Sequence, residues 1–143
     1  MEIIEYHHPQ FTGKTIFCHK DFVPYLDKMG NHAKGLGIVV IVTSSYRTSI
    51  DMKGAIVKPA TKSNHMIGFA IDCNLQLNGK VWNSEALKNP DTTIRSFIQL
   101  CKMDGMRWGE EFSTPDPVHF DVGVNVRNDG SWEKYFNSIN KIT

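Results

Sequence analysis

The sequence has almost no excess of charge of either sign, with 16 Lys and Arg against 15 Asp and Glu and a formal net charge of +1. Basic residues are scattered among acidic ones, so no basic stripe is present. Nucleic-acid binders usually carry a basic face that contacts phosphates, and we therefore expect no nucleic-acid partner. No run approaches the ~20 apolar residues that a membrane span requires, so we also expect no transmembrane segment.

Cysteine is scarce, and its three copies lack the paired spacing of a disulfide framework or of a cysteine-based zinc site. We expect Cys18, Cys73 and Cys101 to be small, partly buried apolar side chains in a fold that does not depend on oxidation. The first residues also lack the basic start, apolar run and cleavage site of a secretory signal. We therefore expect synthesis in the cytoplasm, with release or export needed for any action outside the cell.

The length of 143 residues and the apolar fraction of 41% suit one compact domain over residues 1–143. Periodicity and turn signals predict its elements. We expect strands near residues 3–4 and over 36–42, 69–77, 80–82 and 118–124, and helices over about 20–33, from a cap at Asp91 to Gly105, and from a cap at Ser131. Asn78-Gly79 predicts a hairpin, so the fold class is α+β, with a largely antiparallel sheet and helices packed on one side.

Strand parity places polar groups together on the other side of that sheet. In the strand over 69–77, Asp72 alternates with apolar residues, and His119 does the same in the strand over 118–124. If these strands are neighbours, the two side chains meet on one face, and a bend at Gly68 can bring His65 over it. Two imidazoles and a carboxylate make a plausible zinc site with one position left for water.

Further candidates flank this set. Asp116, between Pro115 and Pro117, is a candidate general acid/base that takes a proton from the attacking water and passes it to the leaving amine. Arg47, just after the strand over 36–42, is a candidate for stabilising an oxyanion or binding a substrate carboxylate. Asp121 shares the face of His119 and is either a partner that orients an imidazole or a solvated surface acid.

Three blocks of the sequence, in order, carry a resemblance to a known family. They are Ser45-Tyr46-Arg47-Thr48, then Ser63-Asn64-His65-Met66-Ile67-Gly68-Phe69-Ala70-Ile71-Asp72, and then Met106 to Gly109 with Asp116 to Phe120. The second block fits the pattern S-x-H-x-x-G-x-A-x-D. The chain resembles the D-alanyl-D-alanine carboxypeptidase and L-alanyl-D-glutamate endopeptidase family of zinc peptidases, over roughly residues 44–122.

The resemblance implies roles for individual residues. It implies one zinc ion held by His65, Asp72 and His119 in a cleft, Asp116 as acid/base, and Arg47 acting on the substrate or transition state. Candidate substrate contacts in the matched blocks are Arg47, Tyr46, Ser63 and Trp108. The implied substrate is the stem peptide of peptidoglycan, and a role like that of a phage endolysin fits a short chain without a signal. We expect a monomer.

The chain departs from the family pattern at two points. Asp116 stands where many relatives carry Glu. Glu110 and Glu111 stand where relatives often have Gly and Asp, so the resemblance does not determine the rim of the pocket or the substrate specificity. Either glutamate is also an alternative to Asp116 as the catalytic base.

Three functions remain open from the sequence. The first is an endopeptidase of the L-alanyl-D-glutamate type. The second is a D-Ala-D-Ala carboxypeptidase with the same chemistry and a different pocket. The third is a non-catalytic zinc module that binds cell wall or a protein, for which Asp116 would be dispensable.

Overall fold

The structure is a computed structural model that describes residues 2–48 and 62–141. In chain order its elements are β1 (Ile3–Tyr6), β2 (Phe11–Gly13), β3 (Ile16–His19), η1 (Lys20–Phe22), α1 (Val23–Leu36), β4 (Ile38–Ser44), η2 (Asn64–Ile67), β5 (Ala70–Leu77), β6 (Lys80–Trp82), η3 (Ala86–Lys88), α2 (Thr92–Met103), β7 (Arg107–Trp108), η4 (Gly109–Glu111), β8 (His119–Asp121), η5 (Val124–Val126) and α3 (Ser131–Asn140). None of the helices in these ranges is long and apolar enough to span a membrane.

The main sheet has the strand order β2-β4-β5-β8-β7, and β6 also pairs with β5. All of its pairings are antiparallel except that between β2 and β4. The edge of β5 that faces away from β4 is shared, because its first half pairs with β8 and its second half with β6. The sequence prediction of a largely antiparallel sheet is therefore confirmed. The first residues of β5 pair with β8 and the last with β6, so the two ends of β5 have different neighbours.

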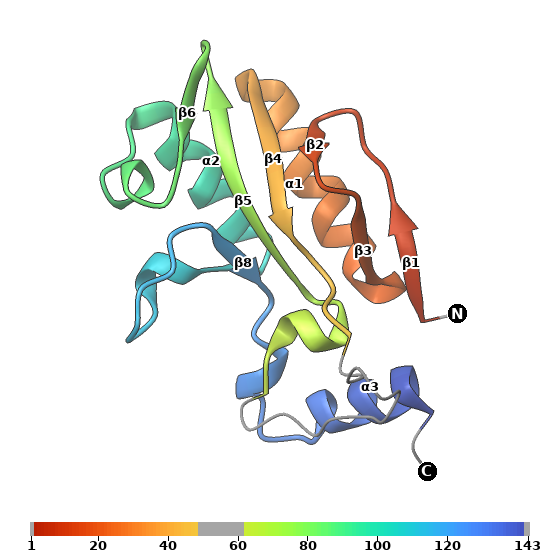
Figure 1. Ribbon diagram of the computed structural model, residues 1–143. Helices are drawn as coiled ribbons and strands as arrows, with labels where there is room; N and C mark the ends of the chain where they lie inside the picture. The colour runs from red at the N-terminus through yellow and green to blue at the C-terminus, as the bar shows by residue number, and fades with distance from the viewer. Residues whose placement is uncertain (1, 49–61, 142–143) are drawn as a thin grey trace.

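Helices α1 and α2 lie together behind this sheet in Figure 1, whereas α3 lies at the end of the molecule, near the start of β5. Ring contacts show which strand face meets the helices, since Phe97 of α2 packs edge-on against Phe120 of β8 at 6.3 Å. Phe120 is fully buried, as are Ile71 and Cys73 of β5. The side chains that alternate with these residues, including Asp72 and His119, consequently face away from α1 and α2.

Local signals explain the best-predicted elements. The hairpin between β5 and β6 turns at Asn78 and Gly79, which both have positive φ, as a two-residue turn of this type requires. Asp91 accepts a hydrogen bond from the Ile94 amide at 2.9 Å and caps α2. All three cysteines are buried and free, as the sequence predicts.

Several expected elements differ from the structure. The helix predicted over about 20–33 covers 23–36 after the short turn η1, and the strand predicted over 36–42 consequently covers 38–44. The strand predicted over 118–124 covers only 119–121, because Gly123 adopts a left-handed conformation and turns the chain into η5. Ser131 does not cap α3, since the cap residue is Gly130 and the Asp129 carboxylate accepts the Ser131 amide at 2.9 Å.

The beginning of the chain is also more ordered than the sequence predicts. The sequence predicts one strand, near residues 3–4, before the first helix, but the structure adds β2 and β3 there. Neither strand is longer than four residues, and β3 pairs with β1 outside the main sheet. Segments this short show no periodicity, and the pairing that stabilises them is long-range.

Candidate metal centre

The three candidate ligands converge where β5 and β8 begin. Asp72 and His119 are direct partners in the antiparallel register. His65 Nε2 lies 3.2 Å from Asp72 Oδ1, and His119 Nδ1 lies 3.0 Å from the same oxygen. One ligand atom from each residue falls within 4.8 Å of the other two. The structure thus brings together all three residues that the sequence singled out as metal ligands.

The turn η2 sets the position of His65. Its amide donates to Ser63 Oγ at 3.2 Å, which caps the turn. The turn ends at Gly68 with φ +74°, and a Cβ atom added there would lie 2.4 Å from the amide nitrogen of His19. Only glycine fits this conformation and this close approach, so Gly68 allows the chain to fold His65 back over Asp72.

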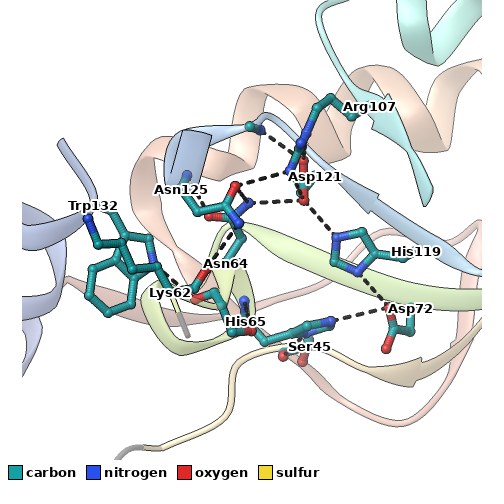
Figure 2. Close-up of polar contacts among 12 residues, drawn as sticks. Ser45, Lys62, Asn64, His65, Asp72, Arg107, His119, Asp121, Asn125 and Trp132 are labelled. Atoms are coloured by element: carbon teal, nitrogen blue, oxygen red, sulfur yellow. Dashed lines mark hydrogen bonds and ion pairs between the residues drawn. The ribbon is translucent and has the colours of Figure 1, made fainter. Parts of the chain in front are cut away.

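Each imidazole has one nitrogen already bonded on the side away from Asp72. His65 Nδ1 donates to the Ser45 carbonyl at 2.7 Å, and His119 Nε2 donates to Asp121 Oδ2 at 2.7 Å. These bonds leave His65 Nε2 and His119 Nδ1 as the nitrogens that face the Asp72 carboxylate (Figure 2), and each can bind a metal once it carries no proton. Fixing the second nitrogen in this way is how proteins orient metal-binding histidines.

Burial and hydrogen bonds act against each other on the charges of the site. Burial disfavours a charged His119, but hydrogen bonds to Asp121 and Asp72 outweigh it and raise the pKa of this imidazole to about 9. Burial also disfavours the Asp72 carboxylate, yet hydrogen bonds from His119 and His65 hold its pKa well below the usual range. In the metal-free protein the site therefore holds an anionic Asp72 and a protonated His119 at neutral pH.

Asp121 is 2% exposed, so it is not the solvated surface acid that the sequence left open. Burial alone would raise the pKa of its carboxyl, but hydrogen bonds from His119, Arg107 and Asn64 outweigh that effect and keep the pKa far below normal. Asp121 is therefore an ionised carboxylate in contact with the outer nitrogen of His119.

The three ligands open onto a cavity of about 470 Å³. Its other lining side chains come from the segment after β4, from η2 and the residue before it, from β7, from the segment between η4 and β8, and from β8 and η5. They are Arg47, Ser63, Asn64, Arg107, Phe112, Thr114, Pro115, Asp116, Asp121 and Asn125.

Asp116 and Arg47, the candidate catalytic residues, both line this cavity. Asp116 is held through its backbone, because its amide donates to the Gly109 carbonyl at 2.8 Å. A Cβ atom at Gly109 would lie 2.1 Å from the Asp116 carbonyl oxygen, so the two segments are in the closest possible contact. The Arg47 side chain is 56% exposed, and its terminal nitrogen lies 3.4 Å from Asp72 Oδ2.

Of the other candidate substrate contacts, one lines this cavity and two do not. Ser63 lines the cavity, but Tyr46 and Trp108 line other hollows of the described surface, Tyr46 beside Phe17 and Trp108 beside α2. Trp108 instead donates its indole N–H to the Pro117 carbonyl at 2.7 Å, next to Asp116. This bond suits a residue that shapes the cavity wall from outside.

The two rival bases lie elsewhere. Glu111 pairs with Lys102 of α2 at 2.7 Å, on the side of Trp108. One Glu110 oxygen is buried without a hydrogen-bond partner among the described residues. Neither glutamate is among the residues that line the cavity, and Asp116 is.

Four cavity residues escaped sequence analysis as functional positions: Asn64, Arg107, Phe112 and Asn125. Arg107 lies in a matched block but received no role from the resemblance, yet its guanidinium binds Asp121 through two hydrogen bonds of 2.7 and 2.9 Å. Parity carries a signal for Asn125, because it lies six residues after His119 and so on the same face of an extended strand. Asn64 immediately precedes a candidate ligand, and nothing in its own pattern marked it.

The donor set fits zinc. Two neutral imidazole nitrogens and one carboxylate oxygen are ligands that zinc accepts, and three protein ligands are typical of a catalytic site, which keeps one position open. The rings are already oriented by bonds to Ser45 and Asp121, so binding requires no rearrangement of the outer partners. It does require that His119 lose its extra proton.

Comparison with known proteins agrees with this geometry. Residues 57–122, which include all three ligands and Asp116, match the family model described as D-alanyl-D-alanine carboxypeptidase. The match supports the resemblance to this family of zinc peptidases that the sequence shows. No curated protein matches the sequence at the significance that we required.

Two solved structures are similar to this chain. One is a mutant of VanY, a vancomycin resistance D,D-pentapeptidase from a VanB-type cassette, in complex with Zn(II). It is 19% identical, with a TM-score of 0.57 over 95% of this chain and 89% of that one. The other is the L-Ala D-Glu endopeptidase ChiX of Serratia marcescens, which is 20% identical, with a TM-score of 0.45 over 73% of this chain and 79% of that one. The first supports the fold that the sequence predicted.

Proposed function

We propose that this zinc peptidase hydrolyses a peptide bond in the stem peptide of peptidoglycan, as an endopeptidase of the L-alanyl-D-glutamate type. The single observation that carries a catalytic role is the shared cavity, which holds a metal-ligand set with an open position, the carboxylate of Asp116 and the guanidinium of Arg47. A purely structural zinc site would be closed by a fourth protein ligand.

Asp116 acts as the general acid/base in this proposal. His65, Asp72 and His119 would hold the zinc ion, which when bound would supply a Lewis acid that polarises the scissile carbonyl and makes water a better nucleophile at neutral pH. Asp116 takes a proton from the attacking water and delivers it to the leaving nitrogen, so the amine departs uncharged. Its backbone bond to Gly109 and its flanking prolines hold the carboxylate at the cavity while leaving its oxygens free for this transfer.

Arg47 provides a cation for the substrate. Its side chain is largely exposed and lies beside the ligand Asp72 rather than in a buried ion pair. A guanidinium in this position can bind a carboxylate next to the scissile bond through two parallel hydrogen bonds. A glutamyl residue linked through its side chain keeps its α-carboxylate free, and this group would bind Arg47.

A D-Ala-D-Ala carboxypeptidase is the second candidate, and two findings favour it specifically. The matching family model carries that description, and the structure with a TM-score of 0.57 is named a D,D-pentapeptidase. The chemistry at Asp116 would be the same, and Arg47 would bind the carboxylate at the end of the substrate.

The deciding experiment combines metal content with product analysis. Purified protein, before and after chelation, is incubated with peptidoglycan and with two synthetic peptides, one ending in D-Ala-D-Ala and one carrying an internal L-Ala-D-Glu bond. We expect about one zinc per chain and a chelator-sensitive cut, with mass spectrometry naming the bond. Release of terminal D-alanine alone would favour the carboxypeptidase, and zinc without any cut would favour a binding module.

The variant Asp116→Asn tests the mechanism within the same assay. We expect it to bind zinc like the parent protein and to lose at least ~10²-fold in kcat, because the amide cannot take the proton. An exposed acid on α3, Glu133, offers the matched control Glu133→Gln, for which we expect unchanged kcat. Full turnover by zinc-loaded Asp116→Asn would contradict the acid/base assignment.

A further inference from the structure

The carboxylate of Asp121 is saturated with hydrogen-bond donors. Oδ1 accepts from Arg107 Nε at 2.7 Å and from the Gly123 amide at 2.8 Å. Oδ2 accepts from His119 Nε2 at 2.7 Å, Arg107 Nη2 at 2.9 Å and Asn64 Nδ2 at 3.0 Å. A carboxylate has about four lone-pair positions, so this set leaves Asp121 no freedom to rotate.

Arg107 makes the largest share of these contacts, and it is placed by the sheet. It is the register partner of Asp121 across β7 and β8, and its guanidinium meets the carboxylate side-on through two nitrogens. Such two-pronged pairing fixes direction as well as distance. Its Nη2 also donates to Asn125 Oδ1 at 3.1 Å, so the guanidinium is itself held from two sides.

A second set of contacts leads from Arg107 to the same imidazole. The guanidinium lies over the ring of Phe112, 4.5 Å from its centre. The ring of Phe112 in turn meets the His119 ring edge-on at 5.5 Å between centres. The Phe112 ring is thus a packing neighbour of both Arg107 and His119, whereas the hydrogen-bonded path from Arg107 to His119 runs through the Asp121 carboxylate.

We propose that Arg107 is a positioning residue of the metal centre, which holds Asp121 in the orientation that presents His119 Nδ1 to the metal. The chain of contacts runs from Arg107 through Asp121 and His119 to Asp72 (Figure 2). Loss of the guanidinium frees the carboxylate to turn, and the His119 ring loses the fixed acceptor that sets its tautomer. This inference rests on the proposed zinc peptidase function.

Two other roles would use the same residue differently. Arg107 also lines the cavity, so a direct contact with substrate would raise KM and leave zinc binding unchanged. A purely structural tie between β7 and β8 would lower the melting temperature and leave both zinc affinity and the His119 ring unchanged.

The test uses Arg107→Met and Arg107→Lys in the whole chain, with Arg127→Met as the matched control. Arg127 is exposed and does not line the cavity. Zinc affinity is measured at fixed pH by competition with a chromogenic chelator. The tautomer of His119 is read from ¹⁵N NMR of the imidazole nitrogens in the zinc-loaded protein.

We expect zinc affinity to fall by ~10-fold or more in Arg107→Met, the order typical of losing an outer partner of a metal ligand. Arg107→Lys keeps the charge without the two-pronged geometry and should fall between Arg107→Met and the parent protein. The His119 Nε2–H signal should broaden or shift in both variants. Arg127→Met should match the parent protein in every measurement.

A double-mutant cycle with Asp121→Asn decides between direct and indirect action. If Arg107 acts through Asp121, adding Arg107→Met to Asp121→Asn should change zinc affinity by less than ~2-fold. An undiminished effect in the double variant, or unchanged zinc affinity with a raised KM in Arg107→Met, would overturn the proposal.

Two further outcomes are distinguishable. Should Arg107→Met fail to fold, Arg107→Lys carries the test alone, and zinc affinity and a His119 signal equal to those of the parent protein would then overturn the proposal. If the parent protein binds no zinc, the proposed function itself fails. Zinc binding and peptide cleavage in the parent, with Arg107 variants indistinguishable from it, would refute this inference alone.

Discussion

The two histidines of the metal centre are held in opposite ways. His65 lies on a short turn and donates its outer N–H to a backbone carbonyl, that of Ser45. His119 lies on a strand and donates its outer N–H to a buried, ionised side chain, Asp121. The His65 side is therefore insensitive to side-chain substitution, whereas the His119 side depends on Asp121 and on the groups that hold it. The hydrogen-bond acceptor of His65 is thus a backbone group that substitution leaves in place, whereas the acceptor of His119 is a side chain that substitution can change.

The largest effect should come from removing either imidazole. We expect His65→Ala and His119→Ala each to lose stoichiometric zinc and chelator-sensitive cleavage, because a site with two protein ligands binds zinc weakly. Metal content after gel filtration and cleavage of a synthetic peptide measure this directly. A variant that kept one zinc per chain would show that the substituted histidine is not a ligand, and the contrast between the two histidines as ligands would then fail.

The variant Asp121→Asn tests how strongly zinc binding depends on the acceptor of His119. We expect zinc affinity to fall by ~10- to 100-fold, because an amide is a weaker acceptor for His119 and leaves Arg107 without its buried counter-charge. Competition with a chromogenic chelator at fixed pH gives the value. Zinc affinity within 2-fold of the parent protein would show that the two histidines are held equally firmly.

The pH dependence of zinc binding gives an intermediate effect. Because the pKa of His119 is raised to about 9 in the metal-free protein, zinc must displace a proton below that pH. We expect apparent affinity to rise ~10-fold per pH unit between about 6.5 and 9 and to level off above it. Calorimetry in buffers of different ionisation enthalpy should record about one proton released at pH 7.5, and no release would contradict the prediction.

The same proton affects the stability of the metal-free protein. A group whose folded pKa is raised stabilises the fold fully below its unfolded value, near 6.5, and this contribution is lost as the pH rises through about 9. Urea unfolding of metal-free protein should therefore show a larger decrease between pH 7 and 10 than the variant His119→Gln shows.

The smallest effect should come from Ser45→Ala. The substitution leaves the Ser45 carbonyl, so His65 keeps its partner and zinc affinity should stay within 2-fold. Only the bond from the Phe17 amide to Ser45 Oγ, 3.1 Å long, is lost, which should lower the free energy of unfolding by ~1 kcal/mol. A loss of zinc affinity as large as that in Asp121→Asn would contradict the contrast between the two histidines.

Strand parity predicted which face carries Asp72 and His119, because alternation along β5 and β8 is a local property of the chain, whereas the pairing of the two strands was an assumption that the structure confirms. Asp72 and His119 were placed on one face from it, and their direct pairing is in the register. The bend at Gly68 was also predictable, since glycine between two patterned segments marks a turn. These features depend on neighbours in sequence, and the sequence displays them.

Contacts between distant segments were not predictable in the same way. The length of β8 was overestimated, because the left-handed turn at Gly123 interrupts an apolar alternation that continues to Val124. Arg107 lies in a two-residue strand with no periodicity, and its role is set by the Asp121 carboxylate across the sheet. Tyr46 and Trp108 sit within the matched blocks, but their side chains line other hollows, because the chain direction at each was not fixed by any pattern.

The close approach of Gly109 to the Asp116 carbonyl carries an evolutionary consequence. Phe112, Thr114 and Pro115 line the cavity between these two points, and of the three only Thr114 neither packs against His119 nor adjoins Asp116, so its side chain can vary most freely in descendants of this chain. Any residue larger than glycine at position 109 would push against the backbone of Asp116 itself. The cavity wall can therefore change at position 114 while Asp116 keeps its place, provided that position 109 remains glycine.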